Sequence, residues 1–199
     1  MERNINMTKR LLFLSLILII AINTYGQSEK SDYYAPTWAL KTNALYLATT
    51  TLNIGVEMGL SKKLTLDVSG NYNPWNLGSN KKLKHFLVQP ELRYWLCERF
   101  NGHFFGLHAH YGQFNVGGIS MLGLDKYRYE GDLYGAGISY GYHWILNKRW
   151  SIEATIGLGY AYLDYSKFDC GECGSKIKDD TRHYWGPTKA GISLIYILK

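Results

Sequence analysis

Hydrophobic and polar residues alternate one by one along much of the chain. Between residues 52 and 60, every even-numbered position is apolar and every odd-numbered position is polar or glycine. Successive side chains of a β-strand point to opposite faces of the sheet, so a period of two predicts a strand with one apolar and one polar face. The alternation resumes after residues 61–63, so segments 52–60 and 64–72 are expected to form a hairpin.

The same alternation predicts eight strands in total. We expect them at residues 38–46, 52–60, 64–72, 84–96, 103–115, 133–145, 150–160 and 184–198. The connections after the second, fourth and sixth strands are short, at residues 61–63, 97–102 and 146–149. The others tend to be longer, at residues 47–51, 73–83, 116–130 and 164–183. Strands joined in this order predict an up-and-down antiparallel sheet.

Charged residues occupy the polar faces of several predicted strands. They are Glu57, Asp67, Glu91, Arg93 and Glu153, and we expect Lys41 and Lys189 beside them. In the narrow interior of a closed eight-stranded barrel, such side chains are tolerated if they pair and hydrogen-bond with one another. The apolar faces then point outward, which suits lipid rather than water. The pattern therefore predicts an all-β fold, an eight-stranded antiparallel transmembrane β-barrel with a polar network in its lumen.

The uneven connections indicate which end of the barrel faces the cell exterior. Outer-membrane barrels have short periplasmic turns and longer extracellular loops, and an even strand number leaves both termini in the periplasm. Aromatic residues near the strand ends fit the interfacial girdles of such barrels, although the general β-propensity of aromatics would also place them there. They include Trp38, Tyr46, Tyr72, Trp75, Trp95, Trp144, Trp150, Tyr160 and Tyr162.

The composition agrees with one β-rich domain. The 199 residues are 19% charged, below the roughly 25% typical of soluble domains, and include 17 tyrosines and 6 tryptophans, which excludes a disordered chain or a coiled coil. The 21 glycines are too many for a helical bundle, because each interior glycine weakens a helix by about 1 kcal/mol. Three cysteines are too few for a disulfide scaffold.

The N-terminus reads as a secretory signal peptide. A basic stretch ending at Lys9 and Arg10 precedes an apolar run at residues 11–22, which is shorter than the roughly 20 residues of a membrane-spanning helix. We expect cleavage after Gly26; the alternative is an uncleaved anchor. The predicted organisation is a signal peptide at 1–26, a short periplasmic segment at 27–37 and an outer-membrane barrel domain at 38–199, in a Gram-negative bacterium.

The charge of the chain argues against nucleic-acid binding. Cleavage would remove three basic residues and one acidic residue, which lowers the formal net charge from +6 to +4. This small excess and the export of the chain do not fit a dedicated nucleic-acid binder.

We expect the mature chain to be a monomer in contact with outer-membrane lipid.

Two of the three cysteines form a C-x-x-C motif, Cys170-Gly171-Glu172-Cys173, in the last predicted loop. In the oxidising envelope we favour a disulfide that staples this loop. A zinc site would need two more ligands, and catalytic thiol exchange would need a thioredoxin-like context that the sequence lacks. Cys97 is expected at the opposite rim, about 25 Å away, as a free thiol.

His108 and His110 lie two positions apart and therefore share one face of a strand. Two histidines at this spacing can chelate a metal ion, but neutral imidazoles lining a polar lumen, with His85 and His143 beside them, explain them as well, and we favour that interpretation. The lumen carboxylates suggest no catalysis, because a filled interior gives a substrate little access. We expect no cofactor and no catalytic residue.

Three segments of the chain resemble a known family. They are Ser69-Gly70-Asn71-Tyr72-Asn73-Pro74-Trp75, the run 88–105 beginning Val88-Gln89-Pro90-Glu91-Leu92-Arg93-Tyr94-Trp95, and Gly186-Pro187-Thr188-Lys189-Ala190-Gly191. On these residues the chain resembles a Bacteroidetes family of small outer-membrane barrels classified as a domain of unknown function. Members often occur near fimbrial genes, so the resemblance implies a surface role with a surface or fimbrial protein as partner. It brings no assigned activity and no catalytic residues.

Three classes of function are open at this point. The first, which we expect, is a surface barrel that acts as a structural or interaction module through its extracellular loops. The second is a small barrel enzyme acting on outer-membrane lipid, which would need a Ser-His-acid set on the lipid face. The third is a lipocalin-like ligand-binding barrel, whose apolar face would have to point inward, against the alternation.

Overall fold

The computed structural model describes residues 36–75, 82–119, 124–169 and 174–198, which form eight strands and one short helix. The strands are β1 (Trp38–Asn43), β2 (Leu52–Gly59), β3 (Leu64–Asn73), β4 (Lys82–Trp95), β5 (Gly102–Ile119), β6 (Leu124–Ile145), β7 (Trp150–Asp169) and β8 (Lys176–Ile197), and the helix is α2 (Ala44–Ala48). The predicted signal peptide lies outside the described residues, and so does most of the segment 27–37.

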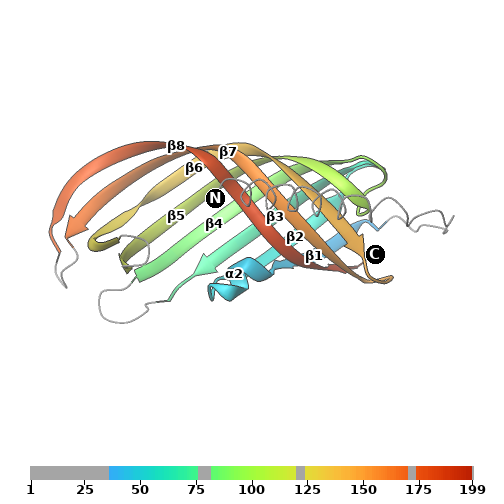
Figure 1. Cartoon of the computed structure of the whole chain (residues 1–199), viewed down its shortest axis with the longest axis horizontal. Coiled ribbons are helices and arrows are strands. Elements are labelled where there is room, and N and C mark those ends of the chain that lie inside the picture. The colour runs from blue at the N-terminus through green and yellow to red at the C-terminus, as the bar shows by residue number, and fades with distance from the viewer. Residues whose placement is uncertain (1–35, 76–81, 120–123, 170–173, 199) are drawn as a thin grey trace, which may run out of the picture. The chain divides into compact units, whose positions relative to one another are not determined.

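Each strand pairs antiparallel with the next strand in the chain, and β8 pairs with β1. The single sheet therefore closes into a barrel, in which the strands run obliquely around the ring (Figure 1). This confirms the predicted all-β architecture of eight antiparallel strands in up-and-down order. Neighbours in sequence are neighbours in space because the connections between them are short.

The first strand ends earlier than predicted because Asn43 begins a helix. Its side chain accepts a hydrogen bond from the backbone N–H of Leu45 at 3.0 Å, the N-cap interaction that favours helix formation. The same side chain also reaches β8, where it donates to the carbonyl of Ala190 at 3.1 Å and accepts from the N–H of Ile192 at 3.3 Å. The predicted strand 38–46 is therefore correct only as far as Asn43.

The long loops predicted at 116–130 and 164–183 are wrong, because most of these residues belong to β5, β6, β7 and β8. The pairing of β6 with β7 runs without a shift from Ile145 opposite Ser151 to Tyr127 opposite Asp169. Strands pair through backbone N–H and C=O groups, which polar residues also carry, so the polar segments continue the strands. As a result β6, β7 and β8 extend beyond β1, β2 and β3 at one end of the barrel, which we call the long-strand end (Figure 1).

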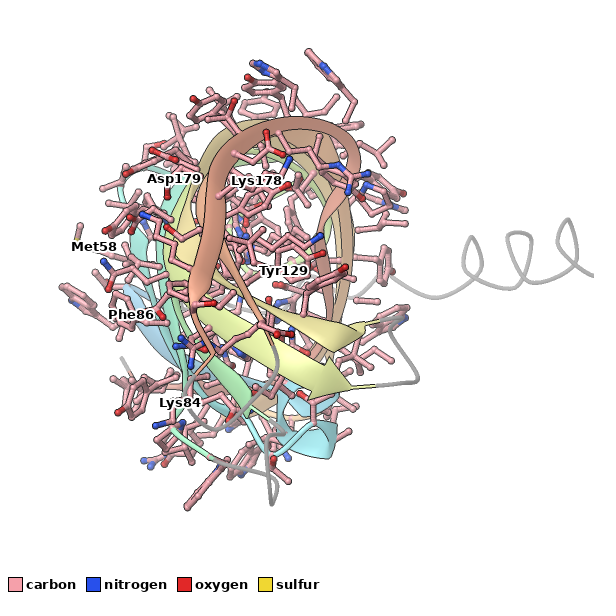
Figure 2. All side chains as sticks on the ribbon, turned by 90° about the vertical axis from the view of Figure 1, so that its left-hand side faces the viewer. Met58, Lys84, Phe86, Tyr129, Lys178 and Asp179 are labelled. Atoms are coloured by element: carbon pink, nitrogen blue, oxygen red, sulfur yellow. The ribbon has the colours of Figure 1, made fainter. Side chains whose placement is uncertain are left out.

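Burial follows the alternation of residue types. On β2, Glu57 is 0% exposed, whereas its neighbour Val56 is 36% exposed and Ile54 is 64% exposed. Figure 2 looks at the long-strand end and shows side chains radiating outward from the ring, Met58 and Phe86 among them. Polar side chains thus fill the ring and apolar ones cover it, which is the reverse of a barrel built for water.

A bulge in β8 brings one more polar residue into the ring. The register against β7 shifts between Lys189 and Pro187, so Thr188 is an extra residue without a partner on β7. Its hydroxyl lies 2.9 Å from Nε2 of His108 on the opposite wall. The bulge therefore fixes the position of that histidine.

Candidate functional site

The interior of the barrel holds seven charged side chains that we call the lumen cluster: Lys41, Glu57, Asp67, Glu91, Arg93, Glu153 and Lys189. Arg93 of β4 joins four of them. Its Nη1 donates to Glu57 and Glu153 at 2.9 Å each. Its Nη2 donates to Asp67 at 3.0 Å and to Glu91 at 3.2 Å. The planar guanidinium suits this role because its donors are held in a rigid fork.

Two lysines, on the adjacent strands β1 and β8, bind some of the carboxylates that Arg93 binds. Lys41 of β1 donates to Glu57 at 2.8 Å and to Glu153 at 3.0 Å, and so links β2 to β7 across the barrel. Lys189 of β8 forms an ion pair with Glu91 of β4. Every residue that the sequence places in the lumen network lies in this cluster.

Hydroxyl groups also donate to three of the four carboxylates, and the charges nearly balance. The donors are Thr65 to Glu57 (2.5 Å), Ser139 to Glu91 (2.5 Å) and Thr155 to Glu153 (3.0 Å). Four carboxylates face three cations, so the lumen cluster has a formal net charge of −1. Nδ1 of His143 lies 3.7 Å from Glu153.

The lumen cluster is withdrawn from solvent. Its side chains are at most 6% exposed, except Lys189 at 12%. Removing an ion from water costs several kcal/mol, and this cost is offset only where pairing and hydrogen bonding are nearly complete. The cluster therefore holds the wall strands in register. Each of its four carboxylates is paired with a cation, so none is free to act as an acid or a base.

Glycines on β5 and β6 make room for these side chains. A Cβ at Gly106 would overlap the carboxylate of Glu91 and the hydroxyl of Ser139. A Cβ at Gly135 would overlap the ring of His110. Small residues on one wall thus admit large polar residues from the neighbouring wall, as the interior of a small barrel requires.

An apolar plug closes the interior toward the short turns. It consists of Trp95, Phe100, Phe104, Ala39 and Ile195, all 0% exposed. The ring centroid of Trp95 lies 4.8 Å from that of Phe104 and 5.9 Å from that of Phe100. Phe100 enters from the connection between β4 and β5 with a φ of +61°. At this end the lumen is packed with side chains.

A small cavity adjoins the lumen cluster and is lined by Lys41, Asp67 and Arg93, among others. Its volume of about 30 Å³ has room for about two water molecules. Oδ1 of Asp67 accepts no hydrogen bond from the described protein atoms, so a water there would have an acceptor. Sites for small molecules are commonly 300–1,000 Å³, so this cavity is too small to hold a substrate.

His108 and His110 both lie in the interior, with ring centroids 5.9 Å apart. Nδ1 of each ring has no hydrogen-bond partner among the described residues. A structural metal ion needs about four ligands, and in the described part of the chain no three His, Cys, Asp or Glu side chains converge on such a position. His143 instead packs edge-on against Trp95, with ring centroids 5.6 Å apart.

The structure describes one of the three cysteines. Cys97 is an exposed free cysteine in the connection between β4 and β5. Cys170 and Cys173, the predicted disulfide, lie outside the described residues, so the pairing stays a prediction. His183, the histidine nearest to this motif in the sequence, belongs to β8, and its Nδ1 is hydrogen-bonded to the hydroxyl of Tyr160 at 2.6 Å.

The outer surface of the barrel carries an apolar band between two aromatic rows. The row near the short turns contains Trp38, Tyr94, Trp144, Trp150 and Tyr196, and the row toward the long-strand end contains Tyr72, Tyr111, Tyr134, Tyr160, Tyr162 and Trp185. Between them the outward positions are mostly aliphatic and exposed, for example Leu107 at 62%, Ile138 at 68% and Ile156 at 60%. We call this surface the apolar band.

The height of the apolar band can be compared with that of a membrane. On β6 the band runs from Trp144 to Tyr134, a separation of ten residues. At about 3.3 Å per residue and a strand tilt of about 40°, this is about 25 Å, the height of the apolar belt of outer-membrane barrels. Directly beyond the upper row, the outward positions become charged, with Asp132 and Glu130 on β6 and Asp164 on β7.

Some interior residues are missed by reasoning from the sequence. Phe104 shares the inward face with His108 and His110, so the alternation could have identified it as a lumen residue. Phe100 lies in a turn, where no periodicity predicts its burial. Thr188 enters the lumen through a register shift that no local pattern announces.

Comparison with known proteins identifies a family without an assigned activity. The family described as "Protein of unknown function (DUF3575)" matches residues 12–198. No curated protein and no solved structure matches the chain. Among the described residues, no helix is long and apolar enough to cross a membrane.

Proposed function

The chain belongs to the DUF3575 family of proteins of unknown function, and we propose that it is an integral outer-membrane β-barrel that acts without catalysis. In this proposal a single copy closes its own barrel, residues 1–26 direct export and are removed, and the long-strand end faces the cell exterior as a surface or interaction module. Bacterial outer-membrane barrels place their short turns in the periplasm, which sets this orientation.

One observation carries the proposal: the barrel is apolar outside and charged inside. Ile138 is 68% exposed while Arg93 is 1% exposed. In water, a continuous apolar band of this size would drive aggregation, whereas in lipid it is the stable arrangement. Closure of the sheet also satisfies the backbone hydrogen bonds that hydrocarbon cannot satisfy.

The alternatives have less support. A lipocalin-like barrel needs an apolar interior, whereas the charged groups of the lumen cluster fill this one. A lipid-modifying enzyme needs a polar catalytic group on the lipid face, whereas the outward positions of the apolar band are nearly all apolar. The partner class that we propose is a surface protein, with a fimbrial protein as the case that the family resemblance implies.

Fractionation and gel migration test this proposal. Expressed with its N-terminal segment, the chain is expected in the outer-membrane fraction and to migrate faster unboiled than boiled, because a closed barrel resists detergent until heated. A known soluble periplasmic protein and a known outer-membrane barrel serve as controls. Recovery of the processed chain with the soluble periplasmic proteins would overturn the proposal.

A further inference from the structure

Just beyond the upper aromatic row, the outer wall of β3, β4, β5 and β6 is hollowed by a cleft of about 450 Å³. Its walls are two rows of outward-pointing side chains, and the residues of each row are paired with one another across neighbouring strands. The first row is Tyr72, Phe86, Gln113 and Asp132, and the second is Lys84, Asn115 and Glu130. The volume lies within the range of small-molecule sites. We call this the rim cleft.

The chemistry of the rim cleft fits a sugar ring. Tyr72 and Phe86 lie side by side and are 52% and 42% exposed, so they present aromatic surface to a ligand. The face of an aromatic ring is negative and attracts the polarised C–H groups on the flat side of a pyranose. Gln113 and Asn115 provide amides, which both donate and accept, as sugar hydroxyls do.

The polar groups of the rim cleft are partly held in place by one another. The hydroxyl of Tyr111 and Nε2 of Gln113 both donate to Oδ1 of Asp132 at 3.1 Å. Nε2 of Gln113 also donates to the hydroxyl of Tyr111 at 3.1 Å. Oδ1 of Asn115 is shielded from solvent and accepts no hydrogen bond from the described residues, so a ligand would reach it only after the Asn115 side chain turns.

The charges of the rim cleft limit which sugar fits. Asp132 and Glu130 line it together with Lys84, and in the described part of the chain Asp132 accepts hydrogen bonds from Tyr111 and Gln113 but forms no ion pair. Glu130 is offset by Arg128, whose guanidinium lies 3.9 Å from it, which leaves the negative charge of Asp132 unpaired among the described residues. A phosphorylated headgroup would meet this negative charge, whereas an uncharged or amino-bearing sugar would not.

We propose that the rim cleft binds the uncharged or amino-bearing sugar headgroup of a glycolipid in the surrounding membrane. This inference rests on the proposed function, because the apolar band places the cleft at the height of lipid headgroups. The acyl chains of the same lipid would lie on the band beneath the cleft. A free sugar has the same headgroup chemistry, so the test separates the two sources.

The test is native mass spectrometry of the processed chain, folded in lauryldimethylamine oxide, a detergent that contains no sugar. The probes are monoglucosyl diacylglycerol, diacylglycerol without a sugar, phosphatidylglycerol and free methyl glucoside. We expect one monoglucosyl diacylglycerol bound per barrel, and weaker retention of the other three probes. Heat-modifiable migration is measured on every sample, so loss of the barrel is distinguished from loss of binding.

Matched variants locate the site. Asp132→Ala and Gln113→Leu are expected to weaken binding of the glucolipid about tenfold each, because each removes a polar partner of the sugar. Asp164→Ala is the control, because Asp164 is the register partner of Asp132 on β7 and does not line the cleft. If Asp132→Ala does not fold, Phe86→Leu tests the same cleft through its aromatic surface.

Each outcome decides for or against the proposal. Loss of glucolipid binding in the cleft variants with retention in Asp164→Ala supports it. Equal binding of diacylglycerol, preference for phosphatidylglycerol, binding of methyl glucoside without the glucolipid, or equal binding by all variants would overturn it. A chain that shows no heat-modifiable migration and fractionates as a soluble protein would overturn the proposed function instead.

Discussion

Val56 and Gly55 are neighbours on β2, but they face opposite environments. Val56 points outward within the apolar band, and Gly55 points into the lumen, where a Cβ would make ordinary contacts, the nearest to Cβ of Lys41 at 3.4 Å. We predict that Val56→Arg destabilises the barrel by about 2–4 kcal/mol, the cost of a cation at the bilayer midplane. Gly55→Ser should cost much less. Urea titrations of refolding into lipid vesicles measure both, and equal losses would show that the faces are assigned wrongly.

Two glycines on opposite faces provide a second comparison. Gly106 faces Glu91 and Ser139 in the lumen, whereas Gly70 has nothing within 4 Å of the position that a Cβ would take. We predict that Gly106→Ala lowers the free energy of unfolding by about 1–3 kcal/mol, because the added methyl group overpacks the lumen. Gly70→Ala should leave it unchanged or slightly raised. The same titrations decide, and equal effects would contradict the packing described here.

Variants of Arg93 and Arg128 compare a buried charge network with a more exposed ion pair. Arg93 is 1% exposed and binds four carboxylates, whereas the side chain of Arg128 is 24% exposed and lies 3.9 Å from Glu130. We predict a loss of about 3–5 kcal/mol for Arg93→Met, which leaves buried carboxylates without their cation. Arg128→Met should cost less than about 1 kcal/mol. A neutral effect of Arg93→Met would mean that the lumen cluster contributes little to stability.

At the scale of elements, the hairpin of β7 and β8 continues beyond the apolar band. Its outer part carries paired charges rather than apolar contacts. Asp179 binds Lys176 at 2.6 Å and accepts from the hydroxyl of Ser166 at 2.6 Å, and Asp180 forms an ion pair with Lys178. These carboxylates add to the backbone pairing of the segment only while they remain ionised.

The pH dependence of this hairpin follows from those carboxylates. Hydrogen bonds from Lys176 and Ser166 lower the pKa of Asp179 below its ordinary value of 3.8, and the hydrogen bond from Lys178 lowers the pKa of Asp180 in the same way. A lowered pKa stabilises the folded hairpin above the ordinary value, and this contribution is lost as the pH falls through the folded pKa. We predict that residues 176–182 lose amide-exchange protection below about pH 4 while the strands of the apolar band keep theirs.

Charge-neutral variants test this dependence. In Asp179→Asn/Asp180→Asn, protection at 176–182 should already be reduced at pH 7 and should change little on acidification. Protection factors, which correct for the intrinsic pH dependence of exchange, are the quantity to compare. An acid response that persists unchanged in the double variant would assign the effect to other groups.

At the scale of the whole barrel, two groups of side chains block the lumen one after the other. The apolar plug of Trp95, Phe100 and Phe104 lies toward the short turns, and the lumen cluster follows it. We predict that the folded chain in a planar lipid bilayer shows no stepwise ion conductance, in contrast to a porin measured in the same membrane. Regular conductance steps that scale with the amount of folded chain would show that the lumen opens.

The alternation of residues by itself determined the strands, their order and their two faces. A period of two is a local property, and short connections pair each strand with its neighbour, so this part of the fold can be predicted without long-range information. The same alternation placed Glu57, Asp67, Glu91, Arg93 and Glu153 on the inward face.

Where the strands end, and which groups meet inside, was decided by the tertiary structure. Pairing between β7 and β8 carried both strands through a charged segment that resembles a loop in sequence, because the backbone of one strand supplies hydrogen bonds to the other. Lys41 and Glu153 lie 112 positions apart and meet because the sheet closes. The bulge at Thr188 and the burial of Phe100 likewise depend on partners distant in the chain, which local periodicity does not encode.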